Sequence, residues 1–334
     1  MMRKMSSLLP KRAKREKLKS ALAIMGPSGS GKTLGSLLMA YGMVQEMYPN
    51  LSDDEIWAKI GLVDSERRRS LVYANTEHQG VRIGEFWHIE LTHPYTVDRY
   101  CEATKNLVDA GCEVVILDSI SHAWEGDGGL LDLQQTMGGT FQAWRDVNPT
   151  YTKFIDLITG ELYDVNIIST LRLKQKHEVT TSETGKLEVV KLGLKPVQRD
   201  SLEYELQIVF NVDMDNMASA SKDNSSLFTG KRFPITPQVG ADIAKWLDKG
   251  IDVRAEQRQR QQAILKKLEA YKEKYGEPVE AKIRGIEKHP SIERTIYEMP
   301  LEWLEKTLGV VELTISEIEK TKNKGEKENE RNNK

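Results

Sequence analysis

Residues 26–33 read Gly-Pro-Ser-Gly-Ser-Gly-Lys-Thr and match the pattern G-x-x-x-x-G-K-S/T at every fixed position. A short apolar run at 22–25 precedes the motif, and apolar residues at helical spacing follow it over 32–47. A glycine-rich turn between a strand and a helix directs backbone N–H groups and the positive end of the helix toward an anion. The motif therefore predicts a loop that binds the phosphates of a nucleoside triphosphate, which we expect to be ATP.

The polar side chains at the end of the loop have separate expected roles. Lys32 is expected to reach the β- and γ-phosphates, and the Thr33 hydroxyl to coordinate Mg²⁺. A magnesium site also needs a carboxylate at the end of a neighbouring strand, and Asp118 follows four apolar residues at 114–117. We therefore expect Thr33 and Asp118 to bind the metal. The residues expected to bind ATP are Gly26, Pro27, Ser28, Gly29, Ser30, Gly31, Lys32 and Thr33.

Short apolar runs alternate with segments of helical periodicity along most of the chain. This alternation is typical of an α/β fold in which helices flank a mostly parallel sheet. The pattern predicts strands at 22–25, 60–63, 114–117, 165–170 and 203–212, and helices at 32–47, 96–109 and 151–159. Polar and β-branched residues alternate over 174–194, which indicates a β-hairpin or an extended loop.

Changes in composition divide the chain into four predicted parts. These are a basic arm at 1–19, an α/β ATPase domain at 20–250, a small C-terminal helical region at 251–318 and a disordered tail at 319–334. The arm is either poorly ordered or directed at the phosphates of a nucleic acid. In the helical region, Ile264, Leu265 and Leu268 form an apolar stripe that packs either within the chain or against a partner.

Composition excludes several classes of protein. A net charge of −2 does not indicate a general nucleic-acid binder, so a polyanion site would need a local basic patch. The two cysteines, Cys101 and Cys112, form no CxxC pair, which argues against a zinc site or a disulfide framework. No stretch approaches the roughly 18 apolar residues of a membrane span, and the N-terminus lacks an apolar signal segment. We expect a cytoplasmic location and no membrane contact.

Hydrolysis of ATP needs a group that orients or deprotonates a water molecule. Glu66 lies just beyond the predicted strand at 60–63, at the carboxyl edge of the sheet where ligands of open α/β sheets bind. Glu77 and Glu125 are the alternatives. We expect Glu66 to be the catalytic carboxylate.

Three stretches of this chain resemble the ATPase core of the RecA recombinase superfamily. They are 26–33, 61–66 with Tyr73 seven residues further on, and 114–126 followed by Gly-Gly-Leu at 128–130. The last stretch is similar to phage-encoded, core-only members of that group. The resemblance covers roughly residues 20–250, implies a RecA-like fold and does not extend to 254–334.

The resemblance implies roles for several residues. Glu66 matches the water-activating glutamate, and Tyr73 matches a tyrosine that stacks on adenine, although it could equally be an ordinary core aromatic. Thr170 occupies the place of a glutamine that senses the γ-phosphate, so this sensing is expected to differ. Arg172 and Lys174 match a basic pair that follows the same strand.

A DNA-binding loop follows this strand in the family. The basic residues expected to contact single-stranded DNA here are Arg172, Lys174, Lys176 and Lys186. The alternative is a solvated hairpin, because Glu178, Glu183 and Glu188 dilute the charge. Earlier in the chain, Trp124, Phe141 and Trp144 either stack on bases or pack against the sheet.

A cation from a neighbouring subunit could complete the catalytic site. Phage relatives often carry Lys-Asp-Arg where this chain has Lys222, Asp223 and Asn224, so Lys222 is the expected trans-acting group, with Lys231 and Arg232 as alternatives. This role requires self-association as a ring or filament.

Taken together, these patterns predict an Mg²⁺-dependent ATPase. The resemblance implies that it binds single-stranded DNA and acts in phage DNA recombination or annealing, in the host cytoplasm if it is phage-encoded. A single-strand-binding or replication protein is an expected partner. Two alternatives stay open. One is a ring-forming, helicase-like motor or loader. The other is a nucleotide-dependent switch that makes no DNA contact and binds a protein through its C-terminal helices.

Overall fold

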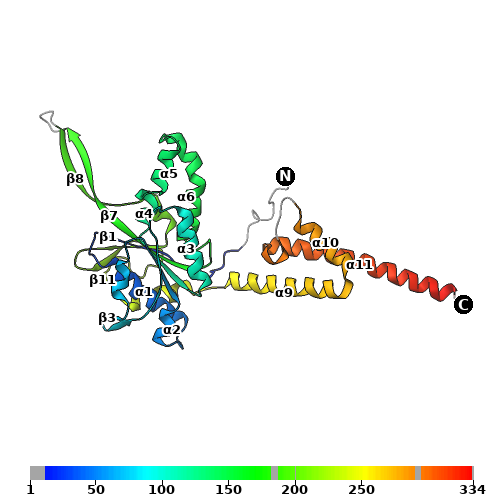
Figure 1. Cartoon of the computed structure of the whole chain (residues 1–334). Coiled ribbons are helices and arrows are strands. Elements are labelled where there is room, and N and C mark those ends of the chain that lie inside the picture. The colour runs from blue at the N-terminus through cyan, green and yellow to red at the C-terminus, as the bar shows by residue number, and fades with distance from the viewer. Residues whose placement is uncertain (1–11, 182–186, 200, 290–294, 333–334) are drawn as a thin grey trace. The chain divides into compact units, whose positions relative to one another are not determined.

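The computed structural model describes residues 12–181, 187–199, 201–289 and 295–332. Two compact units are present. One comprises residues 18–249, and the other joins residues 12–17 to the chain from 250 onward. Figure 1 shows the sheet and its helices in the first unit and a group of helices in the second. The phosphate loop lies in the first unit.

Within the described residues, the first unit is built on a nine-stranded mixed sheet. In spatial order its strands are β11 (Arg232–Pro234), β10 (Met217–Asp223), β9 (Ile208–Val212), β1 (Ala21–Gly26), β7 (Asn166–Thr181), β6 (Val114–Asp118), β2 (Ile60–Asp64) and β5 (Trp87–Glu90), with β8 (Leu187–Pro196) paired to β7. The pairings from β9 to β5 are all parallel, and those of β8, β10 and β11 are antiparallel. The predicted α/β fold with a mostly parallel sheet is confirmed.

The helices of this unit cover both faces of the sheet. They are α1 (Lys32–Met47), α2 (Asp53–Trp57), α3 (Val97–Asp109), α4 (Ser121–Glu125), α5 (Leu130–Thr136), α6 (Trp144–Ile158), α7 (Leu202–Glu205) and α8 (Pro237–Leu247). Strand β1 shows why two layers form. Its residues Ala21, Ala23 and Met25 join the core of α3 and α6, while Leu22 and Ile24 join the core of α1 and α8. Side chains alternate across a strand, so both faces of this strand are apolar and both need a cover.

Several strands differ from the sequence prediction, which did not include β10 or β11. The predicted strand 203–212 begins with a helical turn, α7, and only then continues as β9. Leu202 and Leu206 are both buried while Tyr204 between them is 82% exposed, which a helical turn allows. The parallel edge strand β5 and the short hairpin of β3 (Thr76–His78) and β4 (Val81–Ile83) were not predicted, because their half-exposed residues lack a continuous apolar run.

The second unit has its own apolar core. Helices α9 (Val253–Tyr275), α10 (Glu277–Glu287) and α11 (Leu301–Asn332) pack together, and residues 295–298 contribute a capped 3-10 turn. Ile264 and Leu268 are buried in this core, so the predicted stripe packs within the chain. α11 continues to Asn332 through the segment expected to be disordered. Lys and Glu have high helix propensity, which is the physical reason for this difference.

Helices α1 and α8 approach closely because each has a glycine where the backbone of the other passes. A Cβ on Gly42 would lie 1.8 Å from the Pro237 carbonyl oxygen, and a Cβ on Gly240 would lie 1.9 Å from the Met39 carbonyl oxygen. By contrast, a Cβ on Gly309 in α11 would meet no atom within 4 Å. The contact between α1 and α8 fixes the helix that begins at the phosphate loop.

We expect Gly42→Ala to destabilise the protein by about 1–3 kcal/mol, because the clash outweighs the helix propensity gained from alanine. Gly309→Ala is the matched control and should stabilise its own unit by about 0.5–1 kcal/mol. Urea denaturation followed by circular dichroism measures both changes. A Gly42→Ala protein as stable as the unaltered chain would contradict the packing described here.

Candidate nucleotide-binding site

The phosphate loop connects β1 to α1 in a conformation that leaves room for phosphates. Gly29 and Gly31 have φ values of 85° and 80°, a left-handed region that favours glycine. The Ser30 hydroxyl is buried and has no hydrogen-bond partner. Beside the loop lies a cavity of about 590 Å³, lined by Ser28, Gly29, Gly31, Lys32, Thr33, Glu66, Arg69, Tyr73, Asp118, Arg172 and Leu173. These features fit a nucleotide with its phosphates on the loop.

Strand β7 lies between β1, which leads into the loop, and β6, which ends in Asp118. Asp118 is 2% exposed and accepts hydrogen bonds on both oxygens. Thr33 Oγ1 donates to Oδ2 at 2.6 Å, and Thr170 Oγ1 on β7 donates to Oδ1 at 2.5 Å. The arrangement brings the two predicted metal-binding residues into direct contact.

The donor set fits Mg²⁺. A hydroxyl and a carboxylate are hard oxygen ligands of the kind this ion prefers together with phosphate oxygens. Burial raises the pKa of Asp118 in spite of the hydrogen bonds from Thr170 and Thr33, so a nearby cation would favour its ionised form. Thr33 and Asp118 would hold the metal, which would supply positive charge to the phosphates. Among the described residues, there is no group of three or more His, Cys, Asp or Glu side chains that could hold a metal ion.

Lys32 lies at the floor of the cavity and bonds to the loop itself. Its Nζ donates to the carbonyl oxygens of Gly26 and Pro27 at 2.9 and 2.8 Å. Burial lowers the pKa of Lys32, while the charges of Asp118 and Glu66 act in the opposite direction. A partly buried ammonium between carbonyl groups is well placed to move onto a phosphate that enters the cavity.

Glu66 is held in the cavity by three neighbours. Asp64, at the end of β2, accepts the Glu66 backbone N–H at 2.7 Å, and Ser119 Oγ donates to Glu66 Oε1 at 2.9 Å. Arg172 Nε donates to the same oxygen at 2.7 Å, and its Nη2 donates to Oε2. Burial alone would raise the pKa of Glu66, but the hydrogen bonds and charge of Arg172 and the bond from Ser119 lower it below its usual value.

The other acidic candidates lie elsewhere. Glu77 is exposed on β3, and Glu125 forms an ion pair with Lys174 at 2.8 Å. Neither lines the cavity, whereas Glu66 does. The geometry therefore favours Glu66 among the three carboxylates.

Tyr73 also lines the cavity and is partly buried against the core of α1 and α8. Its ring meets His78 edge-on, with 5.4 Å between the ring centroids. Burial raises the pKa of its hydroxyl, so the side chain stays neutral. The position suits contact with a base, and the role in adenine stacking stays a prediction.

Of the four predicted DNA-binding residues, the two whose side chains the structure describes, Arg172 and Lys174, line different cavities. Arg172 points into the cavity beside the phosphate loop, which we call the nucleotide cavity, whereas the sequence predicted that it contacts DNA. Its neighbour in the register is Gly26 of the parallel strand β1, which sequence order alone does not reveal. Lys174 is exposed and lines a different cavity. The side chain of Lys176 and all of Lys186 lie outside what the structure describes.

Lys222 is distant from the phosphate loop of its own chain. In the sheet, Lys222 of β10 lies opposite Val209 of β9, and Val209 lies opposite Ala23 of β1. Ala23 precedes Gly26 by three residues, which is about 10 Å along the strand. The Lys222 Nζ donates to the carbonyl oxygens of Glu203 and Tyr204, both at 2.8 Å. Action on the nucleotide of its own chain does not fit this placement, and action on a neighbouring subunit stays a prediction.

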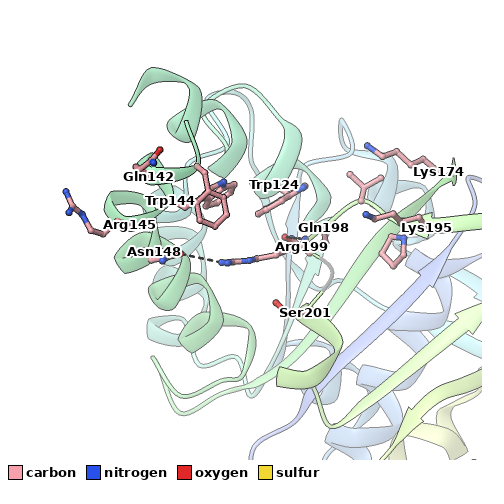
Figure 2. Close-up of a pocket in the computed structure, with 13 residues that line it drawn as sticks. Trp124, Gln142, Trp144, Arg145, Asn148, Lys174, Lys195, Gln198, Arg199 and Ser201 are labelled. Atoms are coloured by element: carbon pink, nitrogen blue, oxygen red, sulfur yellow. Dashed lines mark hydrogen bonds between the residues drawn. The ribbon is translucent and has the colours of Figure 1, made fainter. Parts of the chain in front are cut away.

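A second cavity, of about 1050 Å³, opens between α6 and the base of the β7–β8 hairpin. We call it the aromatic groove, and Figure 2 shows the side chains that line it. Trp124 and Trp144 are stacked with 5.7 Å between ring centroids, and the Arg199 guanidinium lies 5.4 Å from the Trp144 centroid. The lining residues are Trp124, Phe141, Gln142, Trp144, Arg145, Asn148, Lys174, Lys195, Pro196, Val197, Gln198, Arg199 and Ser201.

The fold and the loop geometry define a P-loop nucleotide-binding protein. The model of a family described as AAA domain matches residues 18–238, and the chain belongs to that family of P-loop ATPases. The match supports nucleotide-dependent ATPase activity and does not single out RecA-type phage recombination proteins. A search of curated proteins found no match. Across the described ranges, no helix has both the length and the apolar character needed to cross a bilayer.

We expect the stabilising effect of Glu66 to depend on pH. Because its pKa in the folded chain is lowered from 4.5, the ionised side chain contributes stability at pH values above 4.5. This contribution is lost as the pH falls through the lowered value. At pH 7, Glu66→Gln should reduce the free energy of unfolding by about 1 kcal/mol, a modest figure because Arg172 is partly exposed.

Urea denaturation of both proteins between pH 3 and pH 7 measures this difference. It should be constant above pH 5 and shrink at lower pH. A difference that grows as the pH falls would contradict the assigned direction of the pKa shift.

Proposed function

We propose that this chain hydrolyses ATP with Mg²⁺ and binds single-stranded DNA in the aromatic groove, as a RecA-type ATPase of phage DNA recombination or annealing. The observation that carries the proposal is the shared strand β7. Arg172 on this strand lines the nucleotide cavity, and Lys174, two residues later, lines the aromatic groove. Nucleotide and DNA would therefore bind at neighbouring positions of one element.

In the proposed reaction, a water oxygen forms a bond to the γ-phosphorus while the bond to the β,γ-bridging oxygen breaks. Glu66 orients the water and accepts its proton, and ADP keeps the electron pair of the broken bond. Lys32 moves from the carbonyl oxygens of Gly26 and Pro27 to the phosphates, where it offsets developing negative charge. Tyr73 provides an aromatic surface for the base.

The aromatic groove has the chemistry of a single-strand site. Stacked aromatic rings accept any base on their faces, and neighbouring cations attract the phosphate backbone. Phe141 at the groove is 87% exposed, which is unusual for a phenylalanine that only packs in a core. Arg199 lies over both Trp144 and Tyr151, so its charge faces the stacking surface.

Self-association as a ring or filament belongs to the same proposal. Lys222 is remote from the phosphate loop of its own chain, so its proposed action is on the nucleotide of a neighbour, for which its Nζ would leave the carbonyl oxygens of Glu203 and Tyr204. A single-strand-binding or replication protein would be a further partner.

Steady-state phosphate release tests the ATPase. We expect Lys32→Ala and Glu66→Gln each to lower kcat at least 100-fold, because one removes the phosphate cation and the other the proton acceptor. Glu66→Gln should still bind ATP, whereas Lys32→Ala should not. The control is Glu77→Gln, which alters a glutamate outside the cavity and should leave kcat within twofold. Full activity of Lys32→Ala would contradict the proposal.

Fluorescence anisotropy with a labelled single-stranded oligonucleotide tests the groove. We expect Phe141→Ala to weaken binding by about fivefold or more, because one base–aromatic stack contributes roughly 1–3 kcal/mol. Tyr204→Ala is the matched control, since Tyr204 is 82% exposed and does not line the groove. Equal effects of the two substitutions would contradict the proposed DNA site.

Further measurements separate the alternatives. DNA binding that is unchanged by an ATP analogue and by replacing Lys174 and Lys176 with alanine would contradict the coupled DNA role. Directional strand displacement would favour the motor. ATP hydrolysis insensitive to DNA, with a partner bound by the helical region, would favour the protein-binding switch.

A further inference from the structure

The carboxylate proposed to activate water is engaged by a cation of its own chain. The Arg172 guanidinium contacts both oxygens of Glu66 as a fork, and Ser119 donates to one of them. The Glu66 side chain is 13% exposed, so these contacts replace most of its access to solvent. The guanidinium stabilises the ionised carboxylate, which makes it a weaker base toward a water molecule.

Arg172 is also placed where the terminal phosphate of a nucleotide would arrive. Its register neighbour is Gly26, the first residue of the phosphate loop, and its side chain lines the same cavity as Lys32 and Asp118. In the structure, Arg172 bonds to Glu66 and Lys32 bonds to loop carbonyls. Both cations are thus held by protein acceptors that a phosphate could replace.

The backbone of Arg172 is held by hydrogen bonds to other segments, whereas its side chain is partly exposed and bonds to Glu66. Its N–H donates to Ser121 Oγ at 2.9 Å, and its carbonyl oxygen accepts the Val197 N–H, also at 2.9 Å. The side chain itself is 44% exposed. A change of partner therefore requires rotation of the side chain and no shift of β7.

We propose that Arg172 recognises the γ-phosphate in cis: it leaves Glu66 for the terminal phosphate of bound ATP, and the same movement frees Glu66 to act on water. This inference rests on the proposed ATPase function. Arg172 binds two phosphate oxygens through its planar fork, as it binds the two carboxylate oxygens now. ADP lacks the γ-phosphate, so Arg172 stays on Glu66 when ADP is bound, and Glu66 is restrained between cycles.

Equilibrium binding of fluorescent ADP and of the slowly hydrolysed analogue ATPγS tests this role without reference to turnover. We expect Arg172→Ala to weaken ATPγS binding by about tenfold or more and ADP binding by less than twofold. Arg172→Lys retains the charge without the fork and should show an intermediate loss for ATPγS only. Equal losses for the two nucleotides, or no loss, would overturn the proposal.

A double-mutant cycle with Glu66→Gln separates the exchange of partners from simple charge repulsion. In the presence of Arg172, Glu66→Gln should tighten ATPγS binding about threefold or more, because less energy is needed to withdraw Arg172 from a neutral amide. In the Arg172→Ala background the same substitution should have no selective effect on ATPγS. Equal tightening in both backgrounds would show that the two side chains are not coupled.

These outcomes distinguish this inference from the proposed function. If the unaltered chain binds neither nucleotide and Lys32→Ala behaves identically, both the ATPase proposal and this inference fail. If the unaltered chain binds both nucleotides and Arg172→Ala binds ATPγS normally, only the role of Arg172 fails. Thermal melting checks that each variant is folded. If Arg172→Ala does not fold, the binding of ATPγS and ADP by Arg172→Lys tests the proposal instead.

Discussion

The insertion of β7 between β1 and β6 is the constraint on which the nucleotide site depends. These three parallel strands end at one edge, where β1 supplies the loop, β6 supplies Asp118 and β7 supplies Thr170 and Arg172. Thr33 lies in the first turn of α1, which contacts both β7 and β6, and its hydroxyl reaches Asp118 at the end of β6 at 2.6 Å. The two apolar faces of β1 then require helices on both sides, which secures the sheet.

Glu66, Lys32 and Asp118 each have a partner within the chain. Glu66 is paired with Arg172, Lys32 is surrounded by carbonyl oxygens, and Asp118 accepts two hydroxyl hydrogen bonds. Each of these contacts avoids an isolated charge in a partly buried site, which would be costly. Each also involves a group that a triphosphate or a metal ion could satisfy instead, so the contacts that stabilise the empty fold are also the ones that binding would replace.

Much of the fold could be predicted because buried parallel strands have a strong sequence pattern. The apolar runs before Asp64 and Asp118 predicted β2 and β6 correctly, and the loop predicted the start of α1. The order of strands in space could not be read from the sequence, and for this reason Arg172 was expected on DNA although it lies beside Gly26. Thr170 was noted only as a replaced glutamine, because its bond to Asp118 depends on the same spatial order. The roles of Ser119 and Asp64 in holding Glu66 were missed because single polar residues at strand ends have no distinctive pattern.

Strand β7 carries Thr170, Arg172 and Lys174 at every second position, where they contact Asp118, contact Glu66 and line the aromatic groove, respectively. Side chains alternate along a strand, so the spacing between these three positions is as important as their identity. A single inserted or deleted residue in this stretch would leave each residue type present but turn it toward the wrong partner. A substitution in this stretch changes one contact, whereas a change in the length of the strand displaces all three side chains at once.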